Sequence, residues 1–297
     1  MSVTQLSTKK LSWNGVSIVI PVYNEEGAIA ETIEQIKEIF RDSEKVYELI
    51  IINDGSVDNT ATILRKQEGI QLLEHPVNRG YGAALKTGIV HASYDFIAIT
   101  DADGTYPNER LPHLMRLATK FDMVVGSRTG ENVTYSTIRK IPKFFLVGFA
   151  QWIAKQKIPD LNSGMRVFKK SIALKFIHIL PDTFSFTTTI TLAMLTNNYI
   201  VHYEPIDYFH RVGNSKIKPI RDTLRFFKLI FRTGIYFAPV RIFVPIASLF
   251  FLGFLTSLSL DLFVRQDLTE ATLILFVAAT QLSVFSLLAD MIDKRLS

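Results

Sequence analysis

The stretch VSIVIPVYNEE occupies residues 16–26, and its first seven residues form an apolar, β-branched run of strand length. Comparable runs follow at residues 47–53 (YELIIIN), 70–73 (IQLL), 94–100 (YDFIAIT) and 123–126 (MVVG). Helical patterns separate these runs, at residues 29–40, 58–67, 80–91 and after Pro107. Near-continuous apolar strands that alternate with helices are typical of an α/β domain with a mostly parallel sheet and helices on both faces.

Polar residues come directly after several of these predicted strands. They are Tyr23-Asn24-Glu25, Asp54, Asp101 with Asp103, and Ser127-Arg128. In open parallel sheets, ligands bind beyond the carboxyl ends of the strands, where the following loops meet. The sequence therefore predicts a binding site at that edge of the sheet.

The segment Asp101-Ala102-Asp103 is the clearest candidate for a cation-binding site at this edge. Two carboxylates spaced by one residue can both approach a hard cation and the diphosphate that it bridges. The same pattern occurs in ordinary turns and helix caps. Its place after a buried strand, with Asp54 at the end of a neighbouring strand, favours the cation site. Asp54 itself is placed to hydrogen-bond a base or a ribose.

A glycine-rich segment, NRGYGAALKTG, occupies residues 78–88. It fits neither the dinucleotide-binding fingerprint nor the phosphate-binding P-loop, because the third glycine of the first and the glycine before lysine of the second are missing. We expect a tight loop that leads into a helix near the site, with glycines that permit close backbone packing. The six histidines show no metal-ligand spacing, and we expect structural or surface roles for them.

The composition narrows the class of protein. Cysteine is absent, which excludes disulfides and thiolate metal sites. The formal net charge is +5 over 297 residues, without the dense basic cluster of a nucleic-acid-binding protein, so nucleic acid is not an expected partner. Residues 1–15 contain no apolar segment of signal-peptide length, so we expect the domain that follows to stay in the cytosol.

Two segments near the C-terminus, residues 242–260 and 271–289, contain no charged side chain. As a helix, each of these 19-residue runs would extend roughly 28 Å, close to the hydrocarbon thickness of a bilayer. The connector at residues 261–270 carries four charged residues and is expected in water. Basic residues flank both outer ends, which predicts a transmembrane hairpin with both termini in the cytoplasm. The alternative is a pair of buried helices in a soluble core.

Residues 220–239 precede this hairpin and form an amphipathic pattern. Arg221, Arg225, Lys228 and Arg232 recur at helical spacing in one basic stripe, and Leu224, Phe227, Phe231 and Ile235 occupy another face. A basic, aromatic-rich helix is typical of a segment that lies in the headgroup layer of an anionic membrane. The alternative is a helix packed on the main domain with a solvated basic face, and both can hold at once.

Seven motifs occur in order along the chain: PVYNEE (21–26), NDGSVDNT (53–60), NRGYGAALKTG (78–88), DADGTYP (101–107), VVGSR (124–128), DLNSGMRVFKK (160–170) and HRVGNSK (210–216). Together they resemble the family-2 glycosyltransferases with a GT-A, Rossmann-like fold. Within that family they are similar to the polyprenyl-phosphate glycosyltransferases, which include the dolichol-phosphate mannose synthases. The resemblance covers roughly residues 15–235. Together with the charge and hydropathy patterns it predicts the following domains: an N-terminal extension (1–15), a GT-A domain (16–218), a juxtamembrane amphipathic helix (219–239), a transmembrane hairpin (240–291) and a cytoplasmic tail (292–297).

The resemblance also implies roles for individual residues. The nucleotide-sugar would be bound by Pro21, Tyr23, Glu25, Asp54, Asp101 and Ala102. The catalytic set would be Asp103, Arg128, Arg211 and Lys216, with Asp103 and Asp101 at the metal, Mg²⁺ or Mn²⁺, and with Arg139 and Arg166 at the lipid phosphate. Thr105 stands where relatives often carry Gln, which puts the third protein ligand of the metal in doubt. Asn162 stands where Thr is commoner.

With the predicted membrane hairpin, the resemblance implies an inverting transfer of a hexose from a UDP- or GDP-sugar to polyprenyl (dolichyl or undecaprenyl) phosphate at the cytoplasmic membrane face. One alternative is a polysaccharide synthase, although such enzymes usually carry more transmembrane helices and a Gln-x-x-Arg-Trp stretch, which this sequence lacks. The other is a non-enzymatic membrane scaffold with a degenerate nucleotide-binding domain, although Asp54, Asp101, Asp103 and Arg128 are all present. The hairpin also offers a surface for a homo-oligomer.

Overall fold

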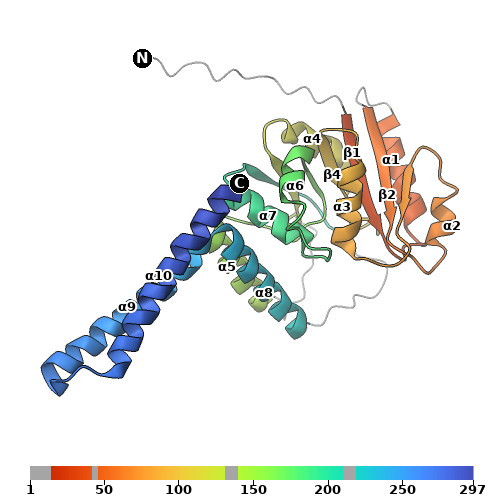
Figure 1. Cartoon of the computed structure of the whole chain (residues 1–297). Helices are drawn as coiled ribbons and strands as arrows, with labels where there is room; N and C mark the ends of the chain where they lie inside the picture. The colour runs from red at the N-terminus through yellow and green to blue at the C-terminus, as the bar shows by residue number, and fades with distance from the viewer. Residues whose placement is uncertain (1–14, 42–45, 131–139, 210–218, 297) are drawn as a thin grey trace, which may run out of the picture.

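A mostly parallel sheet lies at the centre of the first part of the chain (Figure 1). The computed structural model describes residues 15–41, 46–130, 140–209 and 219–296, with only the backbone described at 140–146, 219–226 and 293–296. The strands are β1 (Gly15–Val22), β2 (Val46–Asn53), β3 (Gln71–Glu74), β4 (Phe96–Ile99), β5 (Met123–Ser127), β6 (Arg166–Lys169) and β7 (Val201–Pro205). Within the described ranges the sheet has seven strands in the order β3-β2-β1-β4-β6-β5-β7, and only β6 runs antiparallel to its neighbours. This topology confirms the predicted α/β fold.

The five predicted strands form within two residues of their expected bounds. The sequence patterns do not predict β6 and β7. β6 is four residues long and has Arg166 and Lys169 at its ends, so no apolar run identifies it. β7 lies at the edge of the sheet, where the partly exposed His202 and Glu204 interrupt the apolar pattern.

Helices cover both faces of the sheet. On one face lie α1 (Ile29–Arg41), α2 (Thr60–Leu64) and α4 (Leu111–Ala118), which follows a short 3₁₀ turn (Asn108–Arg110); on the other lie α3 (Tyr81–His91), α6 (Lys170–Phe176) and α7 (Phe186–Thr196). Successive side chains of a strand point to opposite faces, so Ile18 and Ile20 of β1 join the first core and Val19 joins the second. All eight residues of β1 are buried, as expected for a central strand.

α5 (Lys140–Ala154) and α8 (Pro219–Phe237) pack together against α7, outside the sheet (Figure 1). Ile153 of α5, Leu192 of α7 and Ile230 of α8 are fully buried in a third core. Gly234 permits the close approach of the helices, since a Cβ there would lie 2.6 Å from the Ile153 Cδ1. One face of α8 is therefore packed on the main domain.

Two aromatic residues of α8, Phe227 and Phe231, lie on its exposed side, whereas Phe237 at its end is buried in the second core. Phe227 and Phe231 are 49% and 37% exposed and stack on Phe149 of α5, with ring centroids 5.4 and 6.5 Å away. Phe149 in turn stacks on Trp152 of the same helix at 5.8 Å. We call these four residues the aromatic surface. Lys228 and Arg232 are exposed beside it. One side of the described part of this helix therefore packs on the domain, and the other is aromatic and basic; its place in a headgroup layer stays a prediction.

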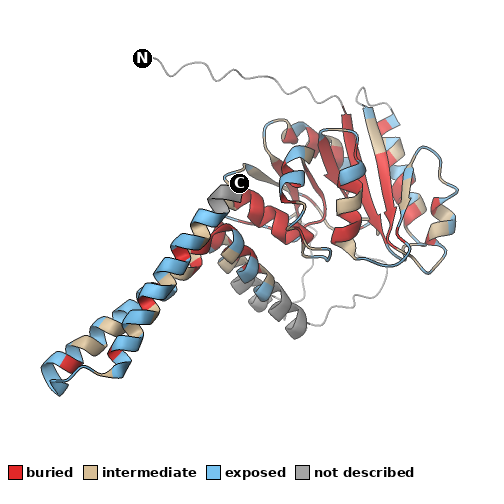
Figure 2. Cartoon of the chain, viewed as in Figure 1, coloured by how far each residue is buried: buried red, intermediate tan, exposed pale blue. Residues whose placement is uncertain are grey.

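α9 (Pro239–Leu260) and α10 (Glu270–Leu296) form a helical hairpin that projects away from the sheet (Figures 1 and 2). Two spans, Pro239–Arg265 and Glu270–Ile292, are long and apolar enough to cross a membrane, each with a mean hydropathy of 2.0. Only 11% and 17% of their most apolar windows are buried, whereas the core helices of a soluble protein would be mostly buried. The hairpin thus has the composition and exposure of a membrane anchor.

In the turn of the hairpin, Arg265, Asp267 and Glu270 are exposed as expected, and Asp261 differs from the expectation. α9 continues as a π-helical turn (Asp261–Arg265), and Asp261 is 1% exposed. Its carboxylate accepts hydrogen bonds from the backbone N–H and the hydroxyl of Thr269, at 2.9 and 2.8 Å, and from the Thr272 hydroxyl at 2.6 Å. Arg265 donates to the other carboxylate oxygen at 3.0 Å. A buried carboxylate needs such partners, so the turn closes around this residue.

Candidate active site

The loops after β1 and β2 are tied together at the carboxyl edge of the sheet. The backbone N–H of Asn24 donates to the Ser56 hydroxyl at 3.0 Å, and the Asn24 side-chain oxygen accepts the backbone N–H of Val57 at 2.9 Å. Asn24 has a φ of 56°, a left-handed conformation that asparagine adopts more readily than most residues. Tyr23 is 44% exposed on this fixed loop, so its predicted contact with a nucleotide is sterically open.

Three other residues predicted to bind the nucleotide are less exposed. Pro21 is buried in β1, and Glu25 is half-buried, with its backbone N–H donated to the Thr60 hydroxyl at 3.0 Å. Ala102 is 3% exposed, and its carbonyl accepts the Thr32 hydroxyl at 3.1 Å. These contacts hold the loops of the edge in place, and the nucleotide contacts of the three residues stay predictions.

Asp54 follows β2 but is 2% exposed and bonded within the protein. One carboxylate oxygen pairs with His75 Nδ1 at 2.7 Å and accepts the backbone N–H of Arg79 at 2.9 Å, and the other accepts that of Gly80 at 2.8 Å. His75 Nε2 lies 3.0 Å from the Thr87 hydroxyl. Asp54 therefore fixes the turn that leads into α3, and His75 has the structural role expected of it. The contact of Asp54 with a base or ribose stays a prediction.

Asp101 and Asp103 lie half-buried in the loop after β4. Asp101 Oδ1 accepts the Tyr81 hydroxyl at 2.9 Å. Asp103 Oδ1 accepts both the hydroxyl and the backbone N–H of Thr105, at 2.6 and 3.2 Å. Thr105 is fully buried, so its hydroxyl orients the carboxylate of Asp103 and does not stand in for the amide of a Gln ligand.

The donor set of this loop fits a divalent cation. Mg²⁺ commonly takes one or two carboxylates and completes its shell with waters and substrate phosphates. Asp101 and Asp103 supply two such carboxylates, and oxygen ligands also suit Mn²⁺. Among the residues that the structure describes, no group of three or more His, Cys, Asp or Glu side chains could hold a metal ion. A cation at Asp101 and Asp103 would therefore need further ligands, which water or a diphosphate can supply.

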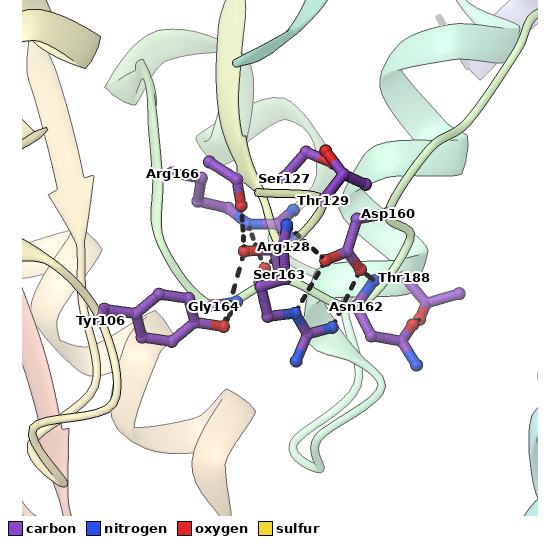
Figure 3. A network of polar contacts seen from close by, with 11 residues as sticks. Tyr106, Ser127, Arg128, Thr129, Asp160, Asn162, Ser163, Gly164, Arg166 and Thr188 are labelled. Carbon is purple, nitrogen blue, oxygen red and sulfur yellow. Dashed lines mark hydrogen bonds and ion pairs between the residues drawn. The ribbon is translucent and has the colours of Figure 1, made fainter. Parts of the chain in front are cut away.

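Arg128 follows β5 and is held by Asp160 (Figure 3). The Arg128 Nε and Nη2 donate to the two Asp160 oxygens at 2.7 and 2.9 Å, and its backbone N–H donates to one of them at 3.1 Å. Burial alone would raise the pKa of Asp160, but the hydrogen bonds and charge of Arg128 outweigh it, so this pKa lies below its ordinary value. The guanidinium is thereby fixed at the edge of the sheet, a position that suits its predicted catalytic role.

The position of Arg166 does not agree with its predicted role as a ligand of the lipid phosphate. Its side chain has no exposed surface. The guanidinium donates to the carbonyl oxygens of Ser163 and Thr187, at 3.2 and 3.1 Å, and to the Thr191 hydroxyl at 3.1 Å. Arg166 thus joins the loop before β6 to α7 and does not face a ligand, so we correct its assignment to a structural role.

Three predicted site residues, Arg139, Arg211 and Lys216, lie outside the described residues, and their roles stay predictions. Conversely, Tyr81, Tyr106 and Asp160 had no predicted role although each lies within a quoted motif. The Tyr106 hydroxyl accepts the backbone N–H of Gly164 at 2.6 Å (Figure 3). Their partners are distant in sequence, so the motifs alone did not reveal these contacts.

Gly164 is required by this arrangement. A Cβ at this position would lie 2.7 Å from Asp101 Oδ2. The glycine therefore lets the loop before β6 pack directly on the carboxylate of Asp101.

Two sequence families match the chain. The model of "Glycosyl transferase family 2" matches residues 17–176, more than half of the chain, which extend from β1 to the end of α6. The model of "GtrB C-terminal hairpin" matches residues 238–294, which contain α9 and most of α10.

Curated relatives give a similar result. The low-salt glycan biosynthesis hexosyltransferase Agl6 of Haloferax volcanii is 28% identical over 71% of this chain and 51% of its own length. The undecaprenyl-phosphate 4-deoxy-4-formamido-L-arabinose transferase of Proteus mirabilis is 31% identical over 58% of this chain and 57% of its own length. The chain thus spans about half the length of the curated relatives it matches.

Solved structures share the fold at low sequence identity. Glucosyl-3-phosphoglycerate synthase from Mycobacterium tuberculosis in complex with UDP has 16% identity and a TM-score of 0.58, over 74% of this chain and 80% of that one. The same enzyme with Mn²⁺, UDP and glucosyl-3-phosphoglycerate has 17% identity and a TM-score of 0.56, over 75% and 79%. This likeness shows a GT-A fold. With the family match over residues 17–176, it follows that the chain belongs to glycosyl transferase family 2 and carries a hairpin of the GtrB type.

Proposed function

We propose that this glycosyltransferase moves a hexose from a UDP- or GDP-sugar onto polyprenyl phosphate at the cytoplasmic face of a membrane, with Mg²⁺ or Mn²⁺ as cofactor. The observation that carries the proposal is the presence in one chain of the Asp101–Asp103 loop at the carboxyl edge of the sheet and of an exposed apolar hairpin. The loop suits a nucleoside diphosphate with its cation. The hairpin would keep that site beside a lipid acceptor.

The relatives support the acceptor, the donor and the metal. The Proteus mirabilis relative is named as an undecaprenyl-phosphate transferase and the Haloferax volcanii relative as a hexosyltransferase. The structural neighbours were solved with UDP and with Mn²⁺ or Mg²⁺. We transfer these properties to this chain as part of the proposal.

The aromatic surface of α5 and α8 supports a site at headgroup height. Trp favours the membrane–water interface, and Phe is common on the apolar face of helices that lie in it. Lys228 and Arg232 beside these rings would attract anionic lipids. Arg241, at the start of α9, donates to the Ile153 carbonyl of α5, which ties the hairpin to this helix pair. The basic residues at both outer ends of the hairpin favour cytoplasmic termini.

The transfer reaction does not need a strong base from the enzyme. A phosphate monoester has a second pKa near ~6, so the acceptor oxygen is largely ionised at neutral pH. It would attack the anomeric carbon directly while the bond from that carbon to the nucleoside diphosphate breaks, with inversion and without a covalent enzyme intermediate. His75 is fixed between Asp54 and Thr87 and is not needed as a base.

The harder task is to stabilise the departing diphosphate. Arg128 is fixed in place by Asp160 and would supply positive charge at the edge of the sheet. Arg211 and Lys216 would add to this charge, and Arg139 would bind the acceptor phosphate. Asp103 and Asp101 would hold the divalent cation, which offsets the charge of the leaving group when bound.

Lipid transfer can be tested with the full chain in bilayer nanodiscs, labelled UDP- and GDP-sugars, and undecaprenyl or dolichyl phosphate. We expect label in the lipid fraction only when polyprenyl phosphate and Mn²⁺ or Mg²⁺ are both present, with one sugar per lipid. Label in a growing polymer would indicate a polysaccharide synthase instead. Absence of transfer from every donor would contradict the proposal, and a trapped glycosyl-enzyme adduct would contradict single displacement.

A further inference from the structure

Tyr81 links Asp101 to a distant turn of the chain. Its hydroxyl donates to Asp101 Oδ1 at 2.9 Å, and its ring stacks on Phe184 with the centroids 5.2 Å apart and the planes at 18°. Phe184 lies just before α7 and is 75% exposed. A tyrosine hydroxyl is a hydrogen-bond donor at neutral pH, since its ordinary pKa is near ~10.

The turn at residues 181–183 is fastened to the first turns of α3. The backbone N–H of Ala83 donates to the Asp182 carbonyl at 3.1 Å, and Lys86 forms an ion pair with the Asp182 carboxylate. A Cβ at Gly82 would overlap the backbone of this turn, so only glycine permits the contact. This is the close backbone packing that the glycine-rich motif predicts. It fixes the position of Phe184 relative to Tyr81.

Asp101 is thereby confined from two sides. Tyr81 holds Oδ1 by a hydrogen bond, and Gly164 packs against Oδ2 closely enough that a Cβ would lie 2.7 Å from it. A carboxylate that helps to bind a cation must keep its orientation when the cation arrives. Hydrogen bonds to metal-binding groups serve this purpose in metal sites, and their removal typically weakens metal affinity by about 10–100-fold.

We propose that Tyr81 is a positioning residue for Asp101 in the binding of the divalent cation, and that Phe184 keeps the Tyr81 ring in place. The inference rests on the metal-dependent part of the function proposed above. It assigns a role to the exposed ring of Phe184, which the fold does not need for its core. It also explains why the glycine-rich motif is packed so tightly beside the loop after β4.

Mn²⁺ binding tests the role of Tyr81 without measuring activity. The full chain is titrated with Mn²⁺ in the presence of UDP, and in parallel GDP, while electron paramagnetic resonance measures free Mn²⁺. Tyr81→Phe removes one hydroxyl and should raise the apparent Kd of Mn²⁺ about tenfold. Tyr203→Phe is the matched control, since the buried Tyr203 hydroxyl has no hydrogen-bond partner among the described residues. We expect an unchanged Kd in this control, and unchanged metal-free nucleotide binding in both variants.

An unchanged Mn²⁺ Kd in Tyr81→Phe would overturn the proposal, and so would an equal rise in Tyr203→Phe. Phe184→Ala provides a second variant that should fold, because the side chain is mostly exposed. Phe184→Ala should weaken Mn²⁺ binding by a smaller factor than Tyr81→Phe, and Phe184→Tyr should restore the binding. An unchanged Kd in Phe184→Ala would overturn the role of Phe184.

The wild-type protein separates this inference from the proposed function. If it binds Mn²⁺ with nucleotide but fails to glycosylate polyprenyl phosphate, only the proposed function is contradicted. If the wild-type protein binds no Mn²⁺ and transfer to lipid persists with chelator, this inference and the metal dependence of the proposed function are both contradicted, while the transfer to polyprenyl phosphate stands.

Discussion

The sheet domain and the hairpin distribute their side chains in opposite ways (Figure 2). In the sheet domain, β1 is buried along its whole length, and exposed positions are mostly on helices and loops. In the hairpin, Leu249 and Ile274 are 69% and 66% exposed, whereas Asp261 and Thr272 are 1% exposed. Such an apolar surface would aggregate in water but is the expected exterior in lipid, where polar groups must be satisfied inside. The sheet domain thus has the side-chain distribution expected in water, and the hairpin has the distribution expected in lipid.

The buried carboxylates of the two regions have different partners. Asp160 of the sheet domain is paired with the guanidinium of Arg128, which it fixes at the site. Asp261 of the hairpin accepts mainly from hydroxyl and backbone groups of the turn, and its Arg265 partner is 52% exposed. The hydrogen bonds of Asp160 position a residue of the candidate active site, and those of Asp261 hold the turn of the hairpin together. Substitutions in the two regions should therefore have unequal effects on activity and stability.

The largest effect is expected at the edge of the sheet. Asp103→Asn removes a charge that would hold the cation, and we expect turnover to fall by about 10²–10³, the usual range for losing one group that stabilises transition-state charge. Transfer to polyprenyl phosphate measures the loss, and a chelator should lower wild-type turnover to a comparable degree. An unchanged melting temperature would show that the fold is intact. Turnover that survives both treatments would remove the electrostatic basis of the mechanism.

Breaking the Asp160 pair should have the next largest effect. Asp160→Asn leaves the mostly buried Arg128 charge without its carboxylate and should reduce the free energy of unfolding by about 3 kcal/mol, the lower end for a broken buried pair. The pKa of Asp160 is lowered in the folded state, so its stabilisation is complete above the unfolded pKa near ~3.9 and is lost as the pH falls through the folded value. Denaturant melts should show the gap between wild type and variant closing below about pH 4. A gap that persists there would contradict the pairing.

The sequence could predict both regions of this comparison, because each has a local signal. Apolar runs of four to seven residues identified the five strands β1 to β5, and two uncharged runs identified the hairpin. The contacts of the site depend on residues far apart in sequence and were missed. Arg166 was predicted as a phosphate ligand because it is an arginine in a motif, but its burial depends on Thr187 and Thr191 of α7. Likewise, only the fold brings Asp160 to Arg128 and Tyr81 to Asp101.

Substitutions of Lys228 and Arg232, the basic residues beside the aromatic surface, should have an intermediate effect on activity. Lys228→Glu with Arg232→Glu replaces attraction to anionic lipids by repulsion, and each basic residue near such a surface contributes about 1 kcal/mol. We expect the KM for polyprenyl phosphate in anionic vesicles to rise at least tenfold, while the affinity for the nucleotide stays unchanged. Arg116→Glu on α4 with Lys120→Glu in the turn after it changes two exposed residues and is a control with the same change in net charge. Equal loss in the control, or equal loss of nucleotide binding, would contradict a membrane-facing role.

The smallest effect is expected at the turn of the hairpin. Asp261→Asn keeps an oxygen that can accept from Thr269 and Thr272 but loses the charge that pairs with Arg265, and Arg265 is already half exposed. Hydrogen bonds within membrane helices are individually weak, so the melting temperature in nanodiscs should fall by a few degrees at most. Mn²⁺ and nucleotide binding should not change, because this turn lies at the end of the hairpin far from the sheet (Figure 1). If Asp261→Asn lowered turnover as much as Asp160→Asn, the hairpin would be coupled to the site and could not be regarded as an anchor alone.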